Sequence, residues 1–162
     1  MRSNGIVLAV LALMLVTVFS SGCTGNNADS NAVTTHAPVP AAVDLRDKGF
    51  IAYINGNYTT ALDLYNQSLT ADPKYTRAWI DKGNVLVKLN RTSEAISSYD
   101  SALALENDLE MVWNSRGEAL MSMGNYKEAL NSFDNVLRIA PDSVIAKQNR
   151  ESVLKKMSTD NI

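Results

Sequence analysis

A period of 34 residues runs along this chain from about residue 42 to residue 143. When the sequence is aligned in steps of 34, three copies share columns of identical or similar residues. The clearest columns are Gly49, Gly83 and Gly117; Ala61, Ala95 and Ala129; Tyr65, Tyr99 and Phe133; and Leu45, Trp79 and Trp113. A fixed period of about 20 to 50 residues is typical of proteins that stack one small unit repeatedly. The period therefore constrains the fold more than any other feature of the sequence.

Each copy is expected to form two helices. In the third copy, Trp113, Gly117 and Leu120 are spaced by four and three residues, which places them on one helical face. A second set on one face begins at Ala129 and continues with Phe133. The spacing predicts a helical hairpin in each copy.

The turns inside and after the hairpins have their own residue columns. Gly56, Asn90 and Gly124 fall in the column between the two helices. Glycine readily adopts the positive φ that ends a helix, and asparagine adopts it next most readily. Pro73 and Pro141 follow the second helices, where a helix cannot continue through proline.

The small residues predict close helix packing. Helices that lie about 8 to 10 Å apart leave little room where they cross. We expect the glycine of the first helix to face the alanine of the second, with Trp or Tyr on either side.

The period and these columns resemble the tetratricopeptide repeat family. The resemblance implies an all-α fold, an α-solenoid of three hairpins at residues 42–75, 76–109 and 110–143, followed by a C-terminal capping helix at 144–162. It is looser in the first copy, where Ala52 replaces a usual aromatic residue and Ser68 a usual alanine.

The first residues have the pattern of a signal peptide. Arg2 supplies a positive charge, Ile6 to Phe19 is an apolar run interrupted only by Thr17, and small residues lead to Cys23. We therefore expect a signal peptide at residues 1–22. The alternative is an uncleaved signal anchor, which requires a generous reading because a spanning helix needs about 20 apolar residues.

Cys23 is the only cysteine and is the expected site of lipidation. Its position after Ser-Gly resembles the lipobox of prokaryotic lipoproteins, in which the mature chain begins at an acylated cysteine. Ser20 departs from the usual bacterial leucine and is compatible with an archaeal lipoprotein. The resemblance implies a lipid anchor on the extracytoplasmic face of the cell membrane. The alternative is a secretory signal with an incidental cysteine.

Residues 23–41 are expected to form a disordered tether after this cysteine. The segment is rich in Asn, Thr, Ala and Pro and shows no apolar period. His36 lies in this segment, and we assign it no role because a flexible segment gives a ligand or catalytic group no fixed partners.

Composition disfavours two classes of function. With 15 Lys and Arg against 17 Asp and Glu, the chain lacks the basic excess that nucleic acid requires. One His, one Cys, and the absence of a glycine-rich phosphate loop leave no constellation for catalysis, metal binding or a cofactor. We expect a protein that is not an enzyme.

In tetratricopeptide proteins the first helix of each repeat lines a concave groove that binds protein or peptide partners. The family pattern implies these positions here: Val43, Arg46, Phe50, Tyr53, Arg77, Ile80, Asn84, Val87, Met111, Asn114, Glu118 and Met121. Their mixture of apolar and polar groups suits an extended peptide. The alternative is that they form an ordinary solvated face.

One specialised form of the groove is not expected. Chaperone-binding members of the family hold a C-terminal carboxylate with Lys, Asn and Arg side chains. Arg46 matches the first basic position, but Phe50, Asp81, Met111 and Ser115 occupy the others.

The sequence also contains N-glycosylation sequons, of which Asn57 and Asn90 fall in the predicted hairpin turns. Two functions remain open. The first is an adaptor or scaffold that docks a partner in the groove, and the alternative is a structural protein of the cell envelope that self-assembles.

Overall fold

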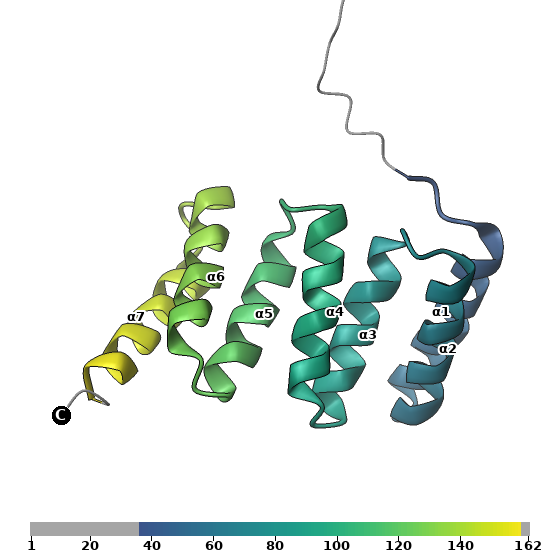
Figure 1. Cartoon of the computed structure of the whole chain (residues 1–162), viewed down its shortest axis with the longest axis horizontal. Coiled ribbons are helices and arrows are strands. Elements are labelled where there is room, and N and C mark those ends of the chain that lie inside the picture. Colours follow the sequence, from purple (N-terminus) through teal and green to yellow (C-terminus); the bar gives the residue numbers. More distant parts are fainter. Residues whose placement is uncertain (1–35, 160–162) are drawn as a thin grey trace, which may run out of the picture. The chain divides into compact units, whose positions relative to one another are not determined.

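The computed structural model describes residues 36–159, which form seven helices and contain no strand. In chain order they are α1 (Pro40–Ile54), α2 (Tyr58–Ala71), α3 (Thr76–Lys88), α4 (Thr92–Leu105), α5 (Glu110–Ser122), α6 (Tyr126–Ile139) and α7 (Val144–Thr159). Each helix packs on the next one, so three antiparallel hairpins and a last single helix follow one another in chain order (Figure 1). The predicted all-α solenoid is confirmed. The predicted signal peptide and Cys23 lie outside the described residues.

The three hairpin turns have the same backbone geometry. Gly56, Asn90 and Gly124 have φ of 77°, 58° and 78°, as the column of turn residues predicted. The following amide in each case bonds back to a carbonyl of the first helix, at 2.9 Å in the first two turns and 3.0 Å in the third. This is the Schellman arrangement, which satisfies carbonyl groups at a helix end.

The two helices of each hairpin cross at the repeated glycine of the first helix. A Cβ on Gly83 would lie 2.4 Å from the ring of Tyr99, and a Cβ on Gly49 or Gly117 would lie 2.7 Å from the ring of Tyr65 or Phe133. The glycine therefore faces the aromatic ring of the second helix, whereas the sequence analysis paired it with the alanine. The alanines are also buried, but they lie one turn away from the crossing.

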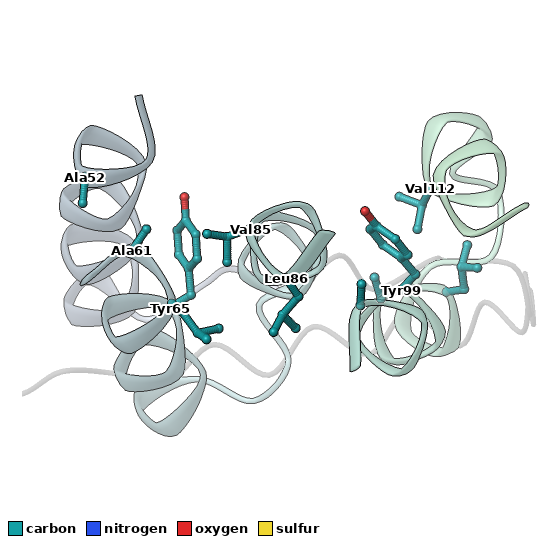
Figure 2. Packing of buried hydrophobic residues seen from close by; sticks show 11 residues of the cluster. Ala52, Ala61, Tyr65, Val85, Leu86, Tyr99 and Val112 are labelled. Atoms are coloured by element: carbon teal, nitrogen blue, oxygen red, sulfur yellow. The ribbon is translucent and has the colours of Figure 1, made fainter. Parts of the chain in front are cut away.

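Successive hairpins share one apolar seam. Figure 2 shows Tyr65 of α2 beside Val85 of α3, and Tyr99 of α4 near Val112 of α5. All four side chains belong to one buried cluster that crosses from the first hairpin to the third. A second cluster joins α5, α6 and α7 through Leu120, Phe133 and Val153. This sharing explains why a single copy could not bury its apolar face alone.

Helix α7 closes the array. Its Ala146 and Val153 are fully buried against the third hairpin, which makes α7 equivalent to the first helix of a fourth repeat. In the glycine column, however, α7 carries Glu151, and in the tryptophan column it carries Lys147. An eighth helix could not cross close to Glu151, so these charges end the stack as a capping helix requires.

Helix α1 begins before the predicted start of the first repeat. Helix α1 begins at Pro40, a residue type favoured in the first helical turn, whereas the sequence placed the tether up to residue 41. The Nε2 atom of His36 donates to the carboxylate of Asp72 at 2.8 Å, and the amide of Val39 donates to the same group at 3.0 Å. His36 therefore has a fixed partner, contrary to the expectation for a flexible segment. The sequence could not indicate a contact that joins positions 36 residues apart.

The helices formed by residues 36–159 are all too short or too polar to span a membrane.

Candidate functional site

Two hollows lie along the first helices of the hairpins. The first has a volume of about 210 Å³ and the second about 290 Å³. Tyr53, Asn84 and Ser115 line both of them, so the hollows adjoin across α1, α3 and α5. We call the two hollows together the groove. In Figure 2 the hydroxyl ends of Tyr65, which lines the first hollow, and Tyr99, which lines the second, point to the same side of the helices.

Most of the predicted groove residues line these hollows. The first hollow is lined by Phe50, Tyr53, Arg77, Ile80, Asn84 and Met111, all of which the sequence placed in the groove. The second is lined again by Tyr53 and Asn84 and by two further predicted residues, Val87 and Glu118. The other predicted positions, Val43, Arg46, Asn114 and Met121, line neither of these two hollows.

Arg46 lines neither hollow because its guanidinium is held by carboxylates. Its Nε donates to Asp81 at 2.5 Å, and its Nη1 donates to Asp47 at 3.0 Å. The guanidinium also lies 5.2 Å from the centre of the Phe50 ring. Arg46 therefore supports the wall of the first hollow and offers no free charge to an occupant.

The predicted positions of the third hairpin are partly taken up by α7. Asn149 of α7 donates to Asn114 at 3.1 Å and approaches Glu118 at 3.4 Å, while Asn114 itself donates to Glu118 at 2.7 Å. Met121 packs against the apolar cluster that includes Val153. Asn114 lines a third hollow beside α7, of about 340 Å³, which shares Met111 with the first hollow. The groove is therefore centred on α3, with α1 on one side and α5 on the other.

Two polar residues that line the groove, Asp81 and Ser115, were noted only as departures from the carboxylate clamp and not among the expected groove positions. Asp81 and Ser115 form one column of the repeat and lie four residues after Arg77 and Met111. A spacing of four places them on the same helical face as residues that were predicted to line the groove. That spacing was the signal that could have identified both.

Asp81 is the most deeply placed charge of the groove. It is only 7% exposed, and its second oxygen lies 3.6 Å from the Nε atom of Arg77. Burial of a carboxylate is costly unless cations and hydrogen bonds compensate it, and here Arg46 and Arg77 do so. Burial, followed by the nearby charge of Asp81, raises the pKa of Tyr65, so this hydroxyl stays protonated.

Asn84 stands at the junction of the hollows with its orientation fixed. The hydroxyl of Tyr99 donates to the Oδ1 atom of Asn84 at 2.9 Å. Burial raises the pKa of Tyr99 to about 12, so this hydroxyl keeps its proton at neutral pH. Because Oδ1 accepts this hydrogen bond, the Nδ2 group of Asn84 is available to donate to a carbonyl oxygen in the groove.

The two sequon residues in the turns are exposed. Asn57 precedes α2 and Asn90 has the positive φ of the second turn. Within residues 36–159, no group of three or more His, Cys, Asp or Glu side chains is arranged to hold a metal ion. The arrangement in the groove is one of apolar surface, paired charges and amide donors, which is suited to binding.

Stacked helical hairpins with a groove along their first helices define the class of α-solenoid repeat proteins. Two family models, both described as tetratricopeptide repeat, match the chain at residues 52–119 and 111–143. Residues 52–143 therefore belong to the tetratricopeptide repeat family, whose members are typically interaction modules. No curated protein matches the chain.

Solved structures of other repeat domains have the same fold. The first repeat domain of Spaghetti (RPAP3), bound to the HSP90 peptide SRMEEVD, has a TM-score of 0.71 and 22% identity, covering 76% of this chain and 98% of that one. The Sgt2 domain from Aspergillus fumigatus has a TM-score of 0.69 and 22% identity, with coverage of 77% and 84%. MamA has a TM-score of 0.70 and 18% identity, with coverage of 72% and 68%. At these identities the likeness concerns the fold alone.

Proposed function

We propose that this protein is an adaptor or scaffold that docks a protein or peptide partner in the groove of its tetratricopeptide repeats. The observation that supports the proposal is the pair of adjoining hollows lined by Phe50, Tyr53, Arg77, Ile80 and Asn84. Apolar surface in a hollow can bury side chains of a partner, and polar groups beside it can bind the main chain. Peptide binding by related folds, such as the HSP90 peptide on RPAP3, is compatible with this use of the groove.

The adaptor acts at the extracytoplasmic face of the cell membrane in this proposal. Support comes from Arg2, the apolar run Ile6 to Phe19 and the position of Cys23. Two acyl chains on one cysteine would hold the protein on the membrane far more firmly than a single chain. A secreted chain would also permit glycans on Asn57 and Asn90, which are exposed in turns away from the buried seam.

Mass spectrometry of the mature protein from native membranes tests this location. The expected first residue is Cys23 with a diacylglyceryl group, and a Cys23→Ser variant should lose that modification. A mature chain that begins elsewhere contradicts lipidation. A chain that retains Met1 and stays in the membrane supports the uncleaved signal anchor, and peptide masses around Asn57 and Asn90 report glycan occupancy.

A triple variant tests the groove itself. Phe50→Ala, Tyr53→Ala and Asn84→Ala together should abolish recovery of a partner that co-purifies with the wild-type protein. The matched control replaces Gln67, Ser97 and Lys127, which are exposed on the second helices, with alanine. Unchanged recovery by the groove variant, with both proteins equally folded by circular dichroism, contradicts the proposal.

Self-assembly by end-to-end stacking receives less support. The outward face of α7 carries Lys147 and Glu151 in place of the residues that receive another helix. The opposite end exposes Ile51, in the column of the buried Val85, but beside it lie the charged Asp44 and Lys48. Sedimentation of the full chain in detergent should show a monomer at all concentrations, whereas mass that grows with concentration favours stacking.

A further inference from the structure

The volume of the first hollow limits what can occupy it. At about 210 Å³ it is smaller than the roughly 300 to 1,000 Å³ typical of small-molecule sites. Phe50, Tyr53, Ile80 and Val112 give it apolar walls. A hollow of this size and lining suits one bulky apolar side chain that enters from a longer segment.

The charges around the groove cancel in each hollow. At the first hollow the carboxylates of Asp47 and Asp81 are paired with the guanidinium groups of Arg46 and Arg77. The second hollow contains one cation, Lys88, and one carboxylate, Glu118. With no net charge of either sign, the groove offers no electrostatic preference for a strongly charged segment.

Asp81 adds a specific penalty for acidic ligands. Its buried carboxylate already accepts from Arg46 at 2.5 Å, so a ligand carboxylate in the first hollow would have to compete for the same guanidinium. Two carboxylates close together repel each other, which disfavours a ligand carboxylate at this position. Arg77, which is more exposed, lies 3.6 Å from the same Asp81 carboxylate and is therefore also partly neutralised.

Asn84 adds a requirement for a hydrogen-bond acceptor. Tyr99 donates to its Oδ1, and its Nδ2 group, which lies at the junction of the hollows, donates no hydrogen bond to another residue of the described range 36–159. A carbonyl oxygen of an extended main chain meets this requirement without introducing charge.

We propose, building on the groove function above, that the occupant is an uncharged extended segment inside a partner protein. The segment places one bulky apolar side chain in the first hollow and gives a main-chain carbonyl to Asn84 Nδ2. Asp81 is the specificity-determining residue that rejects segments ending in a free carboxylate. The groove thus differs in ligand chemistry from that of RPAP3, whose HSP90 peptide SRMEEVD is acidic and ends in Asp.

Selection of displayed peptides tests the proposal on the full chain in detergent. One library presents random heptapeptides flanked by linkers on both sides, and the other presents them with a free C-terminal carboxylate. The wild-type protein should enrich flanked peptides that have one Leu, Met, Phe or Trp and no net charge. Enrichment of acidic peptides or of free carboxylates overturns this inference but supports a binding groove, whereas no enrichment from either library overturns the proposed function as well.

Substitutions of Asn84 and Asp81 then test the role proposed for each residue. With a synthetic copy of the enriched peptide, Asn84→Asp should weaken binding about tenfold, since one hydrogen bond is lost and a carboxylate faces a carbonyl. The control Asn66→Asp makes the same change on the exposed face of α2 and should leave affinity unaltered. Equal affinity of the Asn84→Asp variant overturns the carbonyl contact.

The Asp81→Asn variant provides a gain of binding, which a misfolded protein could not show. It removes the buried carboxylate that competes for the Arg46 guanidinium, so peptides with a free C-terminal carboxylate should become enriched. If this variant still selects only flanked, uncharged peptides, Asp81 does not determine specificity.

Discussion

At the residue scale, the glycine of each first helix sets how closely a hairpin can close. Gly49, Gly83 and Gly117 each face an aromatic ring at a distance that a Cβ could not share. The ring is buried because the glycine leaves space for it, and the same ring then forms the seam to the next hairpin. The column of glycines therefore reflects packing within the hairpin as well as between hairpins.

Replacing Gly83 with alanine should lower the free energy of unfolding by about 1 to 3 kcal/mol, because the new Cβ would meet the Tyr99 ring. Urea unfolding followed by circular dichroism measures this loss. Tyr99→Leu in the same chain should recover part of it, since a smaller side chain yields space at the crossing. If Gly83→Ala has the stability of wild type, the crossing is not limited by this contact.

The turn residues provide a second prediction at this scale. Asn90 has a φ of 58°, a conformation that costs alanine about 1 kcal/mol and glycine almost nothing. Asn90→Gly should therefore retain or raise stability, whereas Asn90→Ala should lower it. Both changes remove the sequon, so the difference between them in thermal unfolding is independent of any glycan. Equal stability of the two variants would contradict a backbone origin.

At the scale of elements, the residues that precede α1 are attached to the turn between α2 and α3. Asp72 accepts hydrogen bonds from His36, from the Val39 amide and from the Lys74 amide. Burial alone would raise the pKa of Asp72, but these hydrogen bonds outweigh it and hold the pKa below its ordinary value. The carboxylate form is therefore part of the folded arrangement at neutral pH.

This arrangement predicts a pH dependence of stability. Because the folded pKa of Asp72 lies below the unfolded value of about 4, the carboxylate stabilises the fold above that pH, and the stabilisation is lost as pH falls through the folded pKa. Asp72→Asn should lower the free energy of unfolding at pH 7 by about 1 to 3 kcal/mol and by less at pH near 3. Asp63→Asn, an exposed change in α2, is the control. An equal loss for Asp72→Asn at both pH values counts against the charged form.

The elements were predictable from the sequence to the extent that they depend on local spacing. The helical faces, the positive φ of Gly56, Asn90 and Gly124, and the groove positions of α1 and α3 all repeat at fixed intervals. The partner of each glycine was not predictable, because alanine and the aromatic residue share one helical face four residues apart. The contact of His36 with Asp72 depends on tertiary packing, and no repeat column marks it. The contact of Asn149 with Asn114, by contrast, occupies the same two repeat columns as the contact of Asp81 with Arg46.

At the scale of the whole repeat array, α7 is what closes the apolar core on one side. Val153 is fully buried and its neighbour Leu154 is 40% exposed. Val153→Asp would bury an uncompensated charge and should cost about 3 kcal/mol or more, whereas Leu154→Asp should have a small effect. Thermal unfolding of both variants measures the contrast. Similar losses in the two would mean that α7 is not docked by the Val153 face.

The groove depends on this same array. Its lining comes mainly from α1, α3 and α5, which are held side by side by the second helices behind them, and α7 contacts Asn114 of α5. A partner segment in the groove should therefore contact α3 most closely, with α1 and α5 on either side of it. The second helices and the outer face of α7 should stay unaffected.

Hydrogen exchange of the full chain, with and without the enriched peptide, tests the central claim most directly. The account predicts slower exchange in α1, α3 and α5, with α2, α4 and α6 unchanged. Protection confined to the second helices or to α7 would contradict a binding groove along the first helices.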